Sequence, residues 1–190
     1  MSIKNLKDII NKQKQEEVDE EFQFEPTEQI KEYQELVEQL YTLTLSSIDE
    51  LIREGLIQVD REKINIHEEA LGDYEIDMLL LSINHKKIKF VPAGTMLIGS
   101  KGRVDVFGPF GSEKFMLIRK GLKKPGDLIK VTVQINDPKN SPSSEREEPR
   151  KKLTVDDWEW KTLPSDNRWM KFDDVTSDTI TDLIMRLING

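Results

Sequence analysis

Residue types that carry much of enzyme chemistry are scarce in this chain of 190 residues. It contains no cysteine, which excludes disulfide bonds, thiolate metal ligands and a cysteine nucleophile. Its two histidines are His67 and His85, and neither has a second histidine at the helical spacing of a zinc motif. No Gly-x-Ser-x-Gly elbow is present to position a serine nucleophile. The sequence therefore predicts no metal site, no cofactor and no catalytic constellation.

Long hydrophobic runs are also missing. The longest, residues 78–81, is far shorter than the roughly 20 residues that a membrane helix needs. The first residues lack the continuous apolar stretch of a secretory signal. Hydrophobic residues make up 36% of the chain, which is enough for one packed domain of this length. We therefore expect a cytoplasmic protein that makes no membrane contact.

The net charge of −8 is distributed unevenly along the chain. Residues 1–84 carry 21 acidic against 8 basic side chains, whereas residues 85–130 carry 3 against 11. One interpretation is that acidic helices lie beside basic strands and the two parts complement each other. The other is that the basic part contacts a polyanion, which requires its basic residues to share an exposed face.

The first third of the chain is predicted to be acidic and helical. Residues 1–26 are expected to form a flexible acidic arm. Apolar residues at steps of three and four then predict a helix over residues 27–54, capped by Thr27. Ser47 and Glu50 fit a capping box, which predicts a break within this helix.

The rest of the chain is predicted to be mainly β-structure. Residues 56–67 suggest a small hairpin, followed by a helical turn up to Gly72. Alternating apolar residues between turns predict further strands, at residues 76–83, 88–91, 103–107, 114–120, 129–135 and 158–161. Because no helix intervenes between these strands, consecutive strands should pair antiparallel.

The C-terminal part is predicted to contain a loop and a helix. Residues 136–152 are rich in proline, serine and charge, which predicts a flexible loop. The final helix is predicted to be capped by Thr176 or Ser177 and to bury one apolar stripe, Ile180, Leu183, Ile184 and Leu187. The predicted fold is thus α+β: a helical N-terminal segment packed on an antiparallel β-meander of about six strands, with a C-terminal helix. Residues 27–190 should form a single domain.

Two neighbouring predicted strands carry a pattern with a known chemistry. Residues 102–106 and 115–120 together resemble the core of the PD-(D/E)xK nucleases. By this resemblance Asp105 matches the metal-binding aspartate and Lys120 the lysine. Ile118 stands where the second acid of the family belongs, and one carboxylate rarely holds a divalent metal ion. The resemblance therefore implies a nuclease-related domain without activity.

Basic residues gather at the predicted turns and strand ends, which suggests a binding surface if these turns meet at one end of the sheet. Phe110, at the tip of a turn, would stack on a base, anchor a protein partner or fold back over the sheet. The candidate binding residues are Lys101, Arg103, Phe110, Arg119, Lys120, Lys123 and Lys124.

The predicted function is that of a small, non-catalytic binding or regulatory protein that acts through a protein–protein interface. Immunity proteins and antitoxin-like inhibitors are of this kind, although this is an analogy of class alone. The acidic helix over residues 27–54 is the expected surface for a protein partner. The alternative is a nucleic-acid-binding or nuclease-related domain that contacts nucleic acid through residues 85–130.

Overall fold

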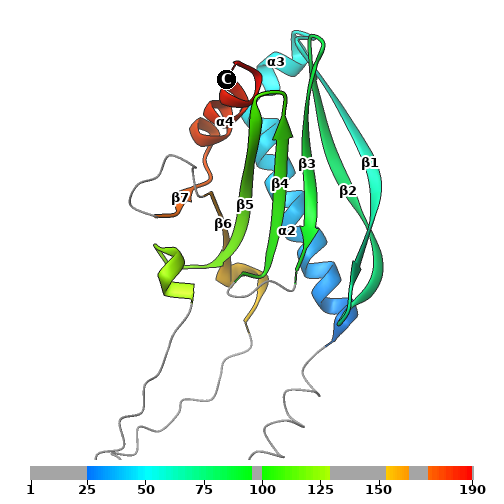
Figure 1. Ribbon diagram of the computed structural model, residues 1–190, viewed down its shortest axis with the longest axis vertical. Helices are drawn as coiled ribbons and strands as arrows, with labels where there is room; N and C mark the ends of the chain where they lie inside the picture. The colour runs from blue at the N-terminus through cyan, green and yellow to red at the C-terminus, as the bar shows by residue number, and fades with distance from the viewer. Residues whose placement is uncertain (1–24, 96–99, 129–152, 163–170, 190) are drawn as a thin grey trace, which may run out of the picture.

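The computed structural model of the protein describes residues 25–95, 100–128, 153–162 and 171–189. These residues form two layers, which are a curved antiparallel sheet and a layer of helices against one of its faces (Figure 1). The long helix α2, Pro26–Ser47, runs along that face, and the C-terminal helix α4, Ser177–Asn189, contacts both α2 and the sheet. The predicted α+β arrangement is confirmed.

The strands of the sheet follow one another in the order of the sequence, and each pairs antiparallel with the next. Their bounds are β1 Ile57–Glu68, β2 Gly72–Ile83, β3 Lys86–Gly94, β4 Gly102–Gly108, β5 Gly111–Arg119, β6 Trp158–Thr162 and β7 Asp173–Asp174. Two short 3₁₀ helices lie between β5 and β6, namely η1 Pro125–Leu128 and η2 Val155–Asp157. The described residues thus form seven strands, where the sequence predicted about six.

Strand β1 is continuous through the region where the sequence predicted a small hairpin. Residues 60–63 pair with residues 77–80 of β2, so the polar stretch belongs to the strand. The hairpin prediction is wrong, because the charged side chains of residues 60–63 are exposed on a continuous strand. Arg61 there donates to the Glu38 carboxylate of α2 at 2.7 and 2.8 Å. The true turn follows Glu68, in place of the predicted helical turn, and Gly72 there has a φ of 80° that favours glycine.

Helix α2 starts one residue before its predicted cap. Pro26 is its first residue and Glu25 occupies the cap position, so Thr27 lies inside the first turn and is not the cap. Proline suits this position because its missing N–H would have no partner within the helix.

The predicted break in this helical region is confirmed, but its predicted capping box is wrong. Ile48 separates α2 from the short helix α3, Asp49–Arg53, which has no side-chain cap hydrogen bond. Ser47, expected to pair with Glu50, instead donates its hydroxyl to the Leu43 carbonyl oxygen at 2.7 Å.

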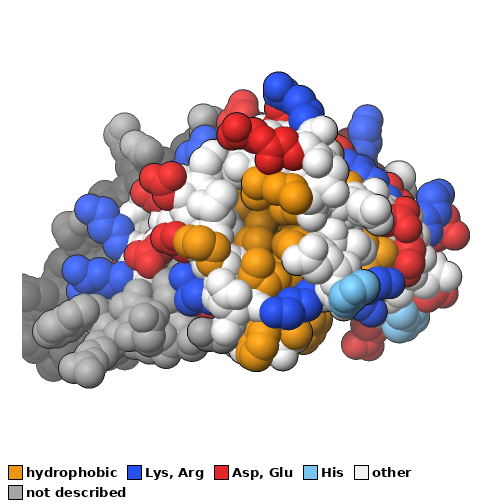
Figure 2. Space-filling view, turned by 90° about the horizontal axis from the view of Figure 1, so that it is seen from above, with side chains coloured by type: hydrophobic (Ala, Val, Ile, Leu, Met, Phe, Trp, Pro, Cys, Tyr) orange, Lys and Arg blue, Asp and Glu red, His pale blue; other side chains and the backbone are white. Residues whose placement is uncertain are grey.

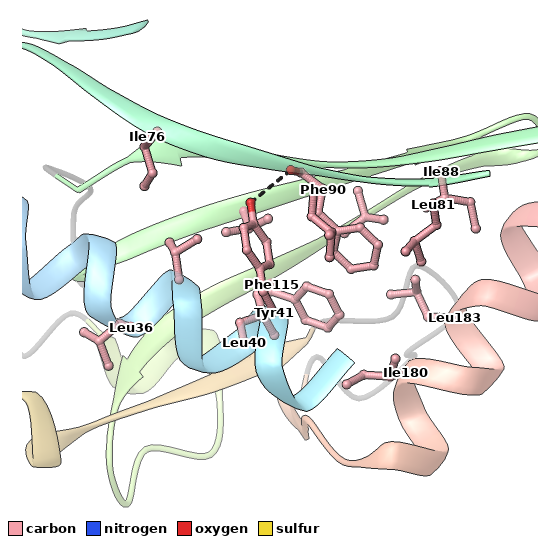
Figure 3. Packing of buried hydrophobic residues seen from close by; sticks show 14 of the residues in the cluster. Leu36, Leu40, Tyr41, Ile76, Leu81, Ile88, Phe90, Phe115, Ile180 and Leu183 are labelled. Atoms are coloured by element: carbon pink, nitrogen blue, oxygen red, sulfur yellow. Dashed lines mark hydrogen bonds between the residues drawn. The ribbon is translucent and has the colours of Figure 1, made fainter. Parts of the chain in front are cut away.

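The core lies between the helices and the sheet. Helix α2 contributes one stripe of buried residues, Tyr33, Leu36, Val37, Leu40, Tyr41 and Thr44. The central strands contribute alternate residues, among them Leu79, Leu81, Ile88, Phe90, Val104, Val106, Phe115 and Leu117. In Figure 3 the ring of Phe90 lies near those of Tyr41 and Phe115, with centroid distances of 6.5 and 6.3 Å. Burial of this stripe stabilises α2 more than its intrinsic propensity does.

The C-terminal helix agrees with its prediction. Thr176 acts as its cap, since its Oγ1 accepts a hydrogen bond from the Thr179 backbone N–H at 3.3 Å. All four predicted core residues are buried, namely Ile180, Leu183, Ile184 and Leu187.

The hydroxyl of Tyr41 joins α2 to the sheet at the point where two strands separate. Strands β2 and β3 pair only as far as Leu79 and Phe90, and beyond them β2 turns away together with β1 (Figure 1). Tyr41 donates to the Asp77 carbonyl oxygen at 2.8 Å and lies 3.2 Å from that of Phe90, the contact drawn in Figure 3. The Tyr41 hydroxyl thereby links the helix to both β2 and β3 next to the point where these strands separate.

Further polar contacts fix the helix at other points of the sheet. Tyr33 donates its hydroxyl to the Arg103 carbonyl oxygen of β4 at 2.6 Å. The indole N–H of Trp160 in β6 donates to the Leu36 carbonyl oxygen at 2.8 Å. Helix α2 is therefore bonded to strands across the width of the sheet.

Three predicted features lie outside the described residues. They are the acidic arm over residues 1–26, apart from Glu25 and Pro26, the strand over residues 129–135 and the loop over residues 136–152.

The contact between Tyr33 and β4 predicts a cost for any side chain at Gly102. A Cβ atom there would lie 2.5 Å from Tyr33 Cε2, and the hydrogen bond of Tyr33 prevents its ring from moving freely. We expect Gly102→Ala to lower the free energy of unfolding by about 1–3 kcal/mol in urea titrations. Gly126→Ala is the control, because a Cβ atom at Gly126 meets nothing within 4 Å. Equal stability of both variants would contradict this packing.

Candidate functional site: an apolar end of the sheet

Large hydrophobic side chains that are exposed gather at one end of the described structure. They are Leu51, Leu56, Phe107, Phe110 and Met185, and we call this set the apolar end. Leu56 and Phe110 are the most exposed of the set, at 55% and 54%. Figure 2 looks onto this end and shows apolar side chains gathered at its centre.

Strand register explains why residues so distant in sequence meet there. Ile57 at the start of β1 pairs with Ile83 at the end of β2, and Ile83 pairs with Lys86 at the start of β3. Lys89 in turn pairs with Phe107 near the end of β4. The start of β1, the β2–β3 turn and the β4–β5 turn therefore lie at the same end (Figure 1).

The end of α4 is fixed to this end of the sheet by backbone contacts. Phe110 donates its backbone N–H to the Leu187 carbonyl oxygen at 3.2 Å. Lys86 donates its ammonium group to the Ile188 carbonyl oxygen at 2.7 Å and lies 5.0 Å from the centre of the Phe110 ring. A cation is favourable both at a helix C-terminus and over an aromatic face. The Phe110 side chain is thus held outward and does not fold back into the core.

Charged residues of opposite sign flank the apolar end. Glu50 and Glu54 are exposed on and just after α3, on the helix side. Lys86, Lys87 and Lys89 are exposed at the start of β3, on the sheet side. Within the described ranges, no ion pair engages Glu50, Glu54, Lys87 or Lys89.

The opposite end of the sheet carries a separate basic group. Arg119, Lys120, Lys123 and Lys124 are all exposed, and none forms an ion pair with another described residue; we call them the basic corner. Backbone hydrogen bonds hold this segment in place. Lys120 N–H donates to the Asp157 carbonyl oxygen at 2.9 Å, and both Lys123 and Lys124 donate their N–H groups to the Asp127 carboxylate at 3.1 and 3.0 Å.

The remaining predicted binding residues are engaged elsewhere. Lys101 lies 2.5 Å from the Glu32 carboxylate, and its side chain is only 10% exposed. Arg103 pairs with Asp105 on the same strand at 2.9 Å. Of the seven candidates, four therefore form the basic corner, two are paired within the protein, and Phe110 lies at the opposite end.

The residues of the nuclease-like pattern do not form a cluster of acids. Asp105 is paired with Arg103, and Ile118, at the position of the missing acid, is fully buried. The part of the chain that the structure describes contains no group of three or more potential metal-ligating side chains.

No helix among the described residues is long and apolar enough to cross a membrane.

A buried polar network lies at the same end as the basic corner, where β1 ends and β3 bends. The Glu68 carboxylate accepts hydrogen bonds from the Tyr74 hydroxyl at 2.5 Å and from the Thr95 backbone N–H at 2.9 and 3.0 Å. Tyr33 lies beside it and accepts the Gly94 N–H at 3.3 Å. Because these groups satisfy one another, we interpret the network as structural.

Most of the apolar end was missed from sequence. Phe110 was predicted as a binding residue, but Leu51, Leu56, Phe107 and Met185 were not. Met185 carries a usable signal, since it is an apolar residue outside the buried stripe of α4. Leu51, Leu56 and Phe107 are recognised as parts of one surface only when the strand register and the position of α3 are known.

Comparison of the chain with models of protein families, with curated proteins and with solved structures found no match. The fold and the surface described above are therefore the observations on which a functional proposal rests.

The three tyrosines of the chain, Tyr33, Tyr41 and Tyr74, predict how stability changes at high pH. Burial is the main cause that raises the pKa of each hydroxyl above its ordinary value of 10.0. A pKa that is higher in the folded state stabilises the fold fully below pH 10 and progressively less as the pH rises above it.

We therefore expect the free energy of unfolding to fall between about pH 10 and pH 12. Tyrosinate absorbance should appear together with the loss of circular dichroism. Titration of all three tyrosines near pH 10 with the fold intact would contradict their burial.

Proposed function

We propose that this protein is a non-catalytic binding or regulatory protein that contacts another protein through its apolar end. The observation that carries the proposal is that every large hydrophobic side chain exposed in the described structure belongs to this one end. Large contiguous apolar patches are rare on monomeric proteins and mark interaction sites. Single exposed hydrophobic residues scattered over the surface would carry no such meaning.

The composition of the apolar end supports the same proposal. Aromatic residues and methionine are enriched at protein interfaces, and Phe107, Phe110 and Met185 supply them here. The strand pairing and the contact of Phe110 with α4 hold the backbone of this surface in place before binding, which lowers the entropic cost of association. An inhibitor of the immunity or antitoxin kind would bind in this manner, and that narrower class remains an analogy.

A serine at two positions of the apolar end tests the proposal. We expect Leu56→Ser/Phe110→Ser to lose the partners that the tagged wild-type protein captures in its native host, because the loss of two central apolar contacts removes hot-spot energy. Quantitative mass spectrometry of the captured proteins is the measurement. Leu122→Ser, at the opposite end, is the control. If the double variant still captured these partners and the Leu122→Ser variant lost them, the interface would lie outside the apolar end.

Binding of a polyanion by the basic corner is a second candidate function. The observation that favours it is the gathering of four exposed cations within residues 119–124, without ion pairs to other described residues. The aromatic residues beside them, Trp158 and Phe172, are half-buried, so phosphates are the main groups that these cations would contact.

Salt dependence provides the test of this second function. With four phosphate contacts, the logarithm of the affinity for a labelled duplex DNA should fall against log salt with a slope of about −3 to −4. Lys123→Glu/Lys124→Glu should abolish binding in fluorescence anisotropy, whereas Lys87→Glu/Lys89→Glu, the same charge change at the other end, should not. Absence of binding at low salt would remove this candidate.

A further inference from the structure

We infer that the partner bound at the apolar end is a second copy of this chain, which forms a two-fold symmetric dimer. This inference rests on the proposed function and names the partner of the same surface. It is carried by the distribution of charge around the apolar end.

The apolar end lies between charges of opposite sign. Figure 2 shows acidic side chains directly above the central apolar group, with basic side chains beyond them, and basic and histidine side chains below it. We define the acidic side as Glu50 and Glu54, which are both exposed near α3. We define the basic side as Lys86, Lys87 and Lys89 at the start of β3. The line from the acidic to the basic side runs from the helix layer to the sheet layer.

Such a surface is complementary to itself. In a two-fold dimer the same patch meets its own copy. If the axis lies in the plane of contact, perpendicular to the line from acids to lysines, each acidic side faces the basic side of the other copy. The apolar centres then meet each other, and two sets of opposite charges form at the rim. Charges arranged in this way favour the correct partner and orientation.

The acidic and basic sides are also free to make these contacts. Glu50, Glu54, Lys87 and Lys89 form no ion pair with any other residue that the structure describes. Elsewhere, exposed charges are often paired within the chain, as in Arg61 with Glu38. A partner of one uniform charge would be attracted to one side of this surface and repelled by the other.

Strand β1, the long edge strand of the sheet, is another surface through which two copies could associate. A two-fold antiparallel pair of β1 strands places each central residue opposite itself or opposite one of the same face. Strand β1 carries four consecutive charged residues, Asp60, Arg61, Glu62 and Lys63. Each register centred on one of them places two like charges opposite each other, which is destabilising. These charges oppose edge pairing in the registers centred on residues 60–63.

Charge reversal tests the dimer. Sedimentation equilibrium of the full chain from roughly 1 to 100 µM should show a monomer–dimer equilibrium for the wild type. Glu50→Lys/Glu54→Lys makes both sides of the surface basic, and Lys87→Glu/Lys89→Glu makes both sides acidic. Each variant alone should dimerise at least about tenfold more weakly than the wild type, because like charges now face each other.

An equimolar mixture of the two variants should recover the dimer, because a basic surface then faces an acidic one on both sides. General damage to the fold cannot produce this recovery, so it separates charge complementarity from misfolding. A mass of one chain for the wild type at the highest concentration overturns the inference, as does a dimer that both reversals leave unchanged. In either case the capture experiment with Leu56→Ser/Phe110→Ser still decides whether the apolar end binds a different protein.

Discussion

The hydrogen bonds from the tyrosines of α2 to the sheet are the constraint on which the rest of the structure depends. Tyr41 satisfies carbonyl oxygens where β2 and β3 separate, and Tyr33 reaches across to β4. A buried carbonyl without a partner costs about 1–3 kcal/mol, so the fold has little freedom to place the helix elsewhere. The β1–β2 ribbon turns away from β3, and there the side chains of Gln34 and Tyr41 in α2 donate to the Glu75 and Asp77 carbonyl oxygens of β2.

The apolar end is a consequence of this arrangement. Short turns between consecutive strands bring the start of β1, the β2–β3 turn and the β4–β5 turn to the same end of the sheet. The C-terminal end of α4 contacts the β4–β5 turn. Apolar residues at these positions have no core to enter, because the helix layer is already occupied by the stripes of α2 and α4. They remain exposed at 39% to 55%. In the protein contact that we propose, burial of these side chains would supply favourable free energy.

The division of charge noted in the sequence has a more specific meaning in the structure. The basic residues of 85–130 do not share one face: Lys86, Lys87 and Lys89 lie at the apolar end, and Arg119 to Lys124 form the opposite corner. Lys101 pairs with Glu32 of the acidic helix, so part of the basic segment does complement the acidic one. The interpretation that the two parts complement each other thus holds for Lys101, whereas contact of the basic corner with a polyanion stays a proposal. Strand register decided which basic residue belongs to which group.

The sequence by itself determined the elements that have a strong period. The buried stripes of α2 and α4 and the antiparallel order of the strands follow from spacing and turn residues, because these are local properties. The break near Ser47 was predicted from a capping box that the structure does not contain. The sequence misjudged β1, since a run of charges resembles a turn unless the neighbouring strand and helix that pair with it are known. It also identified Phe110 alone among the residues of the apolar end. Tertiary structure decided that surface. Its residues come from α3, the start of β1, β4, the β4–β5 turn and α4. Strand register and helix packing bring them together, and both depend on contacts between residues that are far apart in the sequence.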